Sequence, residues 1–340
     1  MSFTERIKPA NRMVGIDFLK LMACMGVIGL HTFQLGESSG NRILFFLAGY
    51  SIPLFFMVNG FLLLGKEKLN YTYLKNKGRN IIILVFLWNL VWALYKFFCK
   101  GEIHNPILES LKNLFLQQGN FSIFWFFGAL LLVYLLAPFL QELIRRNQGR
   151  PLMAVLLESC ILIDILSVFC TLKTGRPLQS YIPQAFRMWT WLFYFTLGGC
   201  IANGYFKKYC ALASGTKAGF LLVSVWANIF YQYFIGYRII GIRMTEYFYD
   251  NIFMIIEVFC LFAAVKQYRF RNSAALILWL ASGLTGVYVL HMTLISHMSG
   301  IYDFENVFLN VLSLPIIFTA CFLAGKLMEK IPFLNRMLKI

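Results

Sequence analysis

The sequence predicts an all-α protein, a polytopic transmembrane helix bundle with about ten membrane-spanning helices. Three observations favour this class. Hydrophobic residues make up 59% of the chain and charged residues only 14%, and the mean hydropathy is +0.67. Apolar runs of about 20 residues, the length that crosses a bilayer as a helix, recur between short polar breaks. Basic residues concentrate in alternate breaks, as in multi-pass membrane proteins.

The polar breaks place the helices in order. The first run ends at GESSGNR, the second at KEKLNYTYLKNKGRN and the third at KFFCKGEIHNPILESLKNLFLQQGN. Pro53 in the second run is a candidate for a kink, because proline cannot bond to the preceding turn. Trp125 marks the outer end of the fourth, where interfacial tryptophans gather. The ten helices are expected near 13–35, 43–65, 79–98, 121–141, 151–171, 188–204, 217–236, 248–265, 276–298 and 306–328.

Lysine and arginine counts orient the bundle. With a cytoplasmic N terminus, the inner segments hold 21 of the 31 basic residues, the outer segments hold 9, and Lys20 is the remaining one. The positive-inside rule then favours both termini in the cytoplasm. The inner count includes Arg6, Lys8, Arg12 and Arg269. We interpret the net charge of +16 as a topology signal and expect no nucleic-acid partner.

The eight cysteines are scattered, without a C-x-x-C pair or a histidine at metal spacing, so we expect neither a metal site nor a disulfide framework. The first apolar run exceeds the core of a signal peptide and lacks an A-x-A-like site. We therefore expect one membrane-embedded domain over residues 1–340, without an appended soluble domain. Its expected location is the cell membrane, in a bacterium the cytoplasmic membrane, and a homo-oligomer is compatible with the sequence.

Ionisable residues single out the first helix, RMVGIDFLKLMACMGVIGLH. Asp17 and Lys20 lie near its start and His31 at its end, although charges inside a membrane are costly. At about 100° per residue these residues share one stripe with Cys24 and Val27, and Lys20 and His31 lie roughly 16 Å apart along the axis. The stripe would suit an elongated ligand with an anionic head near Lys20. The structural alternative has histidines bonding neighbouring helices while Lys20 reaches the inner surface.

Polar residues elsewhere leave the function class open. Asn59 lies mid-helix, where the simplest role is a bond to a neighbouring helix. The basic cluster of YLKNKGRNI suits phosphates or anionic lipid headgroups. Asp164, Glu158 and Glu257 suit either pairing with other helices or the proton path of a transporter, although no inverted repeat is apparent. A silent membrane module serving a partner is a third possibility.

Six segments in order form a recognisable series. They are IDFLKLMACMGVIGLH, PLFFMVNGFLLL, YLKNKGRNI, FWFFGALLLVYLLAPFL, WLFYFTLGGCIANG and VYVLHMTLI. The first resembles a signature of the acyltransferase 3 family, a basic residue followed by a histidine, and the last resembles its late Tyr-x-x-His. Members of that family are integral membrane enzymes that move acyl groups, usually acetyl from acetyl-CoA, onto hydroxyls of sugars and other acceptors.

The resemblance implies that His31 is the catalytic histidine and that Lys20 corresponds to the basic residue that handles the acyl donor. Three departures stand out. Lys20 replaces the usual arginine, so a point charge replaces a bidentate contact. Asn59 replaces a common serine, and Ile123 stands where many members have a histidine. The first two bear on donor geometry and acyl choice, and the third on the acceptor site.

The implied reaction moves acetyl, or another short acyl group, from cytoplasmic acyl-CoA to a hydroxyl of an exported or envelope glycan, as in polysaccharide O-acetylation, or of a small acceptor. His31 would be the general base, and Asn59, Tyr288 or His291 would stabilise the oxyanion. An acyl-enzyme on His31 or Cys24 is the alternative. The expected acyl-CoA-binding residues are Asp17, Lys20, Lys75, Lys77 and Arg79.

Overall fold

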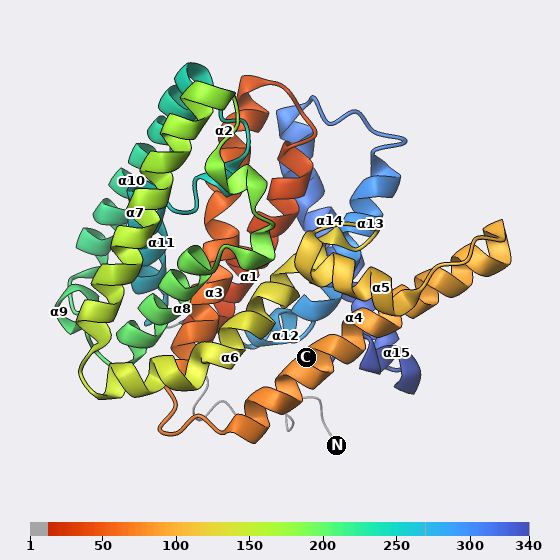
Figure 1. Cartoon of the computed structure of the whole chain (residues 1–340), viewed down its shortest axis with the longest axis horizontal. Helices are drawn as coiled ribbons and strands as arrows, with labels where there is room; N and C mark the ends of the chain where they lie inside the picture. The colour runs from red at the N-terminus through yellow and green to blue at the C-terminus, as the bar shows by residue number, and fades with distance from the viewer. Residues whose placement is uncertain (1–12, 269, 340) are drawn as a thin grey trace.

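The computed structural model describes residues 13–268 and 270–339, so Arg6, Lys8, Arg12 and Arg269 of the basic-residue count lie outside this part. The protein is 79% helix, and the described residues contain no strand. Most long helices run side by side in one bundle, while α4 crosses the bundle obliquely (Figure 1). The all-helical class predicted from the sequence is therefore confirmed.

Helix α1 (Val14–Phe33) lies in the middle of the bundle (Figure 1). Its contacts include α3 (Ser51–Leu64), α12 (Ala274–Ala281), α13 (Leu284–Met298) and α14 (Val307–Met328). Small residues allow these close approaches, since a methyl group added at Gly26 would lie 2.7 Å from Ser51. The helix that carries Lys20 and His31 is thus held from several sides.

The second predicted run, 43–65, is broken in two. It forms α2 (Ser39–Leu47), a 3₁₀ turn (Ala48–Tyr50) and α3. Pro53 lacks the N–H that would bond to Gly49, inside that turn, which gives a physical reason for the break. Helix α3 packs against α8 (Met188–Ala202).

Glycines set the distance between α3 and α8. A side chain at Gly60 would collide with the Phe195 carbonyl, and one at Gly198 with the Met57 carbonyl. The two backbones therefore touch, as small residues permit inside membranes.

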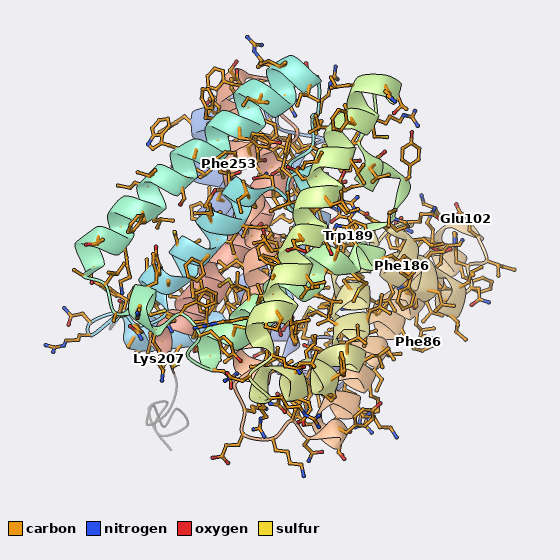
Figure 2. The ribbon with its side chains drawn as sticks, turned by 60° about the vertical axis from the view of Figure 1, so that its left-hand side comes forward. Phe86, Glu102, Phe186, Trp189, Lys207 and Phe253 are labelled. Carbon is orange, nitrogen blue, oxygen red and sulfur yellow. The ribbon has the colours of Figure 1, made fainter. Side chains whose placement is uncertain are left out.

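Helix α4 (Tyr71–Lys100) is the longest and begins eight residues before the predicted start at 79. With the helix that follows it, α4 projects from one side of the bundle, and Glu102 marks the edge of that projection (Figures 1 and 2). The chain then returns through α5 (Pro106–Leu111), a π-helical turn (Lys112–Leu116), a 3₁₀ turn (Ser122–Phe124) and α6 (Trp125–Arg145).

The opposite flank comprises α7 (Gly149–Thr174), α9 (Lys207–Cys210), α10 (Ser214–Ile229) with its π-helical extension (Phe230–Ile240), and α11 (Ile252–Val265). Helices α10 and α11 pack against each other, and α7 packs against α8. Two short 3₁₀ turns lie between α7 and α8, at Leu178–Tyr181 and Gln184–Phe186, and a third lies before α11, at Thr245–Tyr247.

The ninth predicted run, 276–298, is not one straight helix. Helices α12 and α13 meet at an angle of 62°, at a break that contains Gly283. The Cβ position of Gly286 lies 2.9 Å from the Cα of Gly325, so α13 and α14 also touch closely. The short helix α15 (Pro332–Arg336) follows α14.

Every predicted run coincides with a helical segment, but not every segment is long enough to span a bilayer. Seven helical segments of the described residues are long and apolar enough, and the bent α12–α13 pair is an eighth candidate. Helices α8 and α11, with 15 and 14 residues, fall short of the roughly 20 residues that a straight span requires. The count of ten therefore stays a prediction.

Segments predicted on the same side of the membrane contact one another. On the predicted outer side, Asn41 donates a hydrogen bond to the Phe304 carbonyl at 3.1 Å. On the predicted inner side, Gln141 donates to the Lys66 carbonyl at 2.8 Å. These contacts agree with alternating crossings, while the N-in and C-in orientation stays a prediction.

Candidate functional site

An ion pair lies near the start of α1. Lys20 Nζ is 3.0 Å from Asp17 Oδ1, one helical turn away. Asp17 is buried at 2% exposure, whereas the Lys20 side chain remains 29% exposed. The carboxylate therefore orients Lys20, and it is the ammonium group that reaches open space.

That space is a cavity of about 240 Å³, here called the cationic cavity. Its polar lining includes Lys20 on α1, Asn59 on α3, Lys77 on α4 and two residues of α13, Thr285 and Tyr288. No carboxylate is among the lining residues that the structure describes. One positively charged space thus brings together four residues predicted from separate motifs: Lys20, Asn59, Lys77 and Tyr288.

Asn59 is held in place on two sides. Its amide nitrogen donates to the Phe55 carbonyl at 2.9 Å, and its amide oxygen accepts from the Tyr134 hydroxyl at 3.3 Å. Since an amide nitrogen carries two hydrogens, one stays available to a ligand. Tyr134 also lines the cavity but was not singled out from the sequence, where it is one aromatic residue in an aromatic-rich run.

Lys75 and Arg79 line a different space from Lys77. They border a groove of about 630 Å³ on the other face of α4. Residues four apart share a helix face, whereas a residue two positions away points elsewhere. Tyr134 borders both spaces. Of the five predicted acyl-CoA-binding residues, Lys77 and the ion pair of Asp17 and Lys20 therefore lie at the cationic cavity. The other two, Lys75 and Arg79, border the adjoining groove.

The two predicted histidines form a pair. The ring centroids of His31 on α1 and His291 on α13 are 5.3 Å apart. The Tyr288 ring is 5.9 Å from the His291 ring and itself lines the cationic cavity. His291 is 1% exposed, and His31 is half-buried. Neither histidine is among the residues lining the cationic cavity; Tyr288 lies between that cavity and the pair.

Hydrogen bonds fix the tautomer of His291. Its Nδ1 lies 2.7 Å from the Tyr288 carbonyl oxygen and 3.2 Å from that of Val287. Carbonyl oxygens only accept, so Nδ1 carries the hydrogen and Nε2 holds a lone pair in the neutral ring. Nε2 is buried and has no hydrogen-bond partner among the described residues. In this tautomer His291 can take a proton, but it cannot donate from Nε2 to an oxyanion.

Tyr288 separates the cationic cavity from a second space. Its hydroxyl donates to the Ile123 carbonyl at 2.5 Å. Ile123 lines a cavity of about 480 Å³, here called the aromatic cavity, whose other lining residues are Trp88, Val91, Trp92, Tyr95, Asn120, Phe121, Val289, Met292, Thr293, Ser296 and His297. Ile123, which stands where a histidine is common in the family that the sequence resembles, therefore lies on the boundary between the two cavities.

Cys24 faces away from this site. It is buried in a cluster that includes Ile28, Phe318 and Cys321. The stripe expected along α1 is thus divided, because Lys20 faces the cavity whereas Cys24 packs toward α14. This position does not favour Cys24 as a carrier of an acyl group.

The carboxylates proposed for a transporter occupy unlike surroundings. Glu158 is exposed on α7. Asp164 is half-buried and accepts from the Tyr231 hydroxyl at 3.4 Å. Glu257 on α11 is 1% exposed and accepts from Asn228 of α10 at 2.5 Å. None of the three lines the cavities described above.

A buried carboxylate that the sequence did not single out is Asp250, before α11. It accepts from Gln179 at 3.1 Å, from the Trp189 indole at 3.2 Å and from Thr190. Trp189 is labelled in Figure 2. Asp250 lies near the start of the predicted run 248–265, so its position as an ionisable residue in an apolar run is the signal that could have singled it out.

Comparisons with known proteins connect this geometry to a family. A family model described as an acyltransferase domain matches residues 13–326. A protein named amino-acid racemase from Enterococcus faecalis is 22% identical over 260 residues, which are 72% of this chain and 36% of that protein. The chain thus covers little more than a third of this relative. No solved structure matches.

Proposed function

We propose that this chain, which belongs to the acyltransferase domain family, is a membrane O-acyltransferase using acyl-CoA. Its family and its apolar helices make it a multi-pass membrane protein. The observation that carries the proposal is the convergence of Lys20, Lys77, Asn59 and Tyr288 on one cavity, beside a pair of histidines.

The charges suit an anionic acyl donor. Acetyl-CoA, or the CoA ester of another short acyl group such as succinyl, carries phosphates that Lys75 and Arg79 would hold in the groove of α4. The pantetheine arm would then pass Tyr134 into the cationic cavity, where Lys20 and Lys77 lie. Binding energy from the nucleotide would thus position the thioester near Tyr288.

The histidines suit proton transfer. An acceptor hydroxyl would attack the thioester carbonyl while His31, or the free Nε2 of its neighbour His291, takes the hydroxyl proton. The free amide hydrogen of Asn59 would stabilise the oxyanion. The C–S bond then breaks, the acyl group stays on the acceptor oxygen as an ester, and the protonated histidine returns the proton to the thiolate, which leaves as CoA. No metal takes part in this scheme.

The acceptor stays open to two classes at this stage. A glycan hydroxyl, as in the O-acetylation of exported or envelope polysaccharide, fits the family. A small acceptor such as an amino acid is the alternative, and the relative named amino-acid racemase gives it a specific reason for consideration.

Acyl-CoA turnover tests the proposal. Purified protein in nanodiscs is supplied with acetyl-CoA or succinyl-CoA, and thiol release is followed for wild type, His31→Ala and His104→Ala. His104 is a matched control, since it lies in the loop after α4 and bonds to Glu102 at 3.1 Å. Wild type and the control should release CoA, while His31→Ala loses roughly 10²-fold or more. Absence of any CoA release from wild type with either ester would contradict the proposal.

A further inference from the structure

We infer that the aromatic cavity is the acceptor site and that it selects an uncharged ring bearing hydroxyls, such as a neutral sugar residue, over an amino acid. This inference rests on the proposed function. It concerns a space that none of the predicted catalytic or acyl-CoA-binding residues lines.

One wall of the cavity is aromatic, and its rings are tilted against one another, with interplanar angles of 65° for Trp88 and Phe121 and 80° for Trp92 and Phe121. Trp88, Trp92 and Tyr95 follow one another on α4 at spacings of four and three residues, so they share one helix face. Phe121 joins them, with ring centroids 5.8 Å from Trp88 and 6.2 Å from Trp92. Such rings offer broad apolar faces against which the C–H face of a sugar can pack.

The opposite wall supplies hydrogen-bonding groups. Thr293, Ser296 and His297 line the cavity from α13. His297 Nδ1 lies 2.7 Å from the Thr293 carbonyl oxygen, so it carries the hydrogen and leaves Nε2 as an acceptor. A ligand between the walls would therefore meet apolar rings on one side and polar groups on the other.

Charge distinguishes the two cavities. Two ammonium groups line the cationic cavity, whereas no lysine, arginine, aspartate or glutamate is among the described residues of the aromatic cavity. An amino acid would leave its ammonium and carboxylate groups without charged partners, and burying unpaired charges is costly. A volume of about 480 Å³ lies within the range of small-molecule sites. The cavity thus suits an uncharged acceptor.

The aromatic wall is supported from behind. The Trp88 indole N–H donates to the Met337 carbonyl at 2.9 Å, and Met337 is 1% exposed. The segment after α15 therefore fixes the plane of Trp88, which reduces the entropy lost when a ligand packs on it.

The two cavities share a wall beside the histidines. Tyr288 lines the cationic cavity, and its hydroxyl bonds to Ile123, which lines the aromatic one. His291 follows Tyr288 by one turn of α13. An acceptor hydroxyl at the Ile123 end would thus approach the thioester and the histidines from the side opposite the two lysines.

Binding and transfer experiments test this assignment. Protein in nanodiscs, without acyl-CoA, is titrated with radiolabelled neutral methyl glycosides and with L-serine, and transfer from acetyl-CoA to the same compounds is then measured. The variants are Trp92→Ala and Trp92→Phe, with Trp226→Ala as the control, because Trp226 is 72% exposed on α10. Thr293→Val combined with Ser296→Ala alters the opposite wall if Trp92→Ala fails to fold.

At least one glycoside should bind wild type, and Trp92→Ala or the double variant should weaken its binding and raise its KM at least tenfold. Trp92→Phe should keep most of the binding. The Trp226→Ala control should resemble wild type in glycoside binding, in KM and in CoA release to water. Tighter binding of serine, no binding of any glycoside, or unchanged KM in both wall variants would overturn the inference. Glycoside binding that depends on Trp92 without any CoA release would instead remove the proposed function and leave a sugar-binding site.

Discussion

Buried polar groups behave differently on the two flanks of this bundle. Between α1, α3, α4 and α13, the side chains of Lys20 and Lys77 open into a cavity, and His291 Nε2 has no partner in the described structure. Between α10 and α11, Thr245 donates to Gln232 at 2.8 Å, Gln232 to Asn228 at 2.9 Å, and Asn228 to Glu257. Near α1 and α13 one buried imidazole nitrogen is left unpaired, whereas the α10–α11 contact pairs this series of polar groups internally.

The difference separates chemistry from architecture. An apolar environment penalises every unpaired polar group, so groups without a structural role are normally paired. The series of hydrogen bonds between α10 and α11 meets that requirement and stabilises the contact between the two helices. His291 Nε2 on α13 leaves it unmet among the described residues, which is expected where a ligand completes the pairing. This contrast favours the enzyme over a transporter that runs through Glu257.

The largest effect should come from the unpaired histidine nitrogen. In His291→Asn, the amide N–H can still bond to the Tyr288 carbonyl, but the Nε2 lone pair is lost. We expect CoA release and acyl transfer to fall roughly 10²- to 10⁴-fold, the usual contribution of an acid–base group, with thermal stability nearly unchanged. Activity close to wild type would show that the free nitrogen takes no part in the reaction.

The next effect concerns the lysine of the cationic cavity. Lys20→Met keeps most of the length of the side chain and removes its charge, so the KM for acetyl-CoA should rise roughly 10- to 100-fold, as expected for the loss of a charge-assisted contact. Lys20→Arg is the matched control and should keep most of the affinity. If the KM for acetyl-CoA changes with neither the charge nor the length of the side chain at position 20, the nucleotide must bind elsewhere.

On the paired flank, substitution should alter stability and leave catalysis intact. Asn228→Leu removes a buried amide, so Glu257 loses its hydrogen bond from Asn228 and the Gln232 amide nitrogen loses its acceptor, while Gln232 Oε1 keeps its bond from Thr245. This change should cost about 1–3 kcal/mol of unfolding free energy. Ser224→Ala is a control on the same helix, because its hydroxyl bonds only to the Leu221 carbonyl. Thermal unfolding in detergent measures both. A loss of CoA release by folded Asn228→Leu protein would weaken the contrast between the flanks.

The smallest effect should follow Glu158→Gln. This carboxylate is exposed on α7, and exposed substitutions usually change stability by less than about 0.5 kcal/mol. Acyl transfer should be unaltered. Proton-coupled uptake into proteoliposomes that is abolished by Glu158→Gln would instead favour the transporter.

The amino-acid sequence by itself determined the helical class and the position of a helical segment at each predicted apolar run, but not the short helices α5, α9 and α15. Apolar runs and polar breaks carry that information because a membrane helix must bond its own backbone and match the bilayer thickness. It also supplied His31, Lys20, Asn59, Tyr288 and His291, through ionisable or polar residues inside apolar runs and through the family's motifs.

Only the tertiary structure decided which of these residues meet. A helical repeat shows which residues share a face but not which face meets a neighbour, so Lys77 reaches the cavity while Lys75 and Arg79 border the groove. The 62° bend between α12 and α13 and the shared wall at Tyr288 and Ile123 depend on contacts between segments distant in sequence. The aromatic cavity arose in the same way, since its tryptophans lie in a run where aromatic residues are too common to stand out.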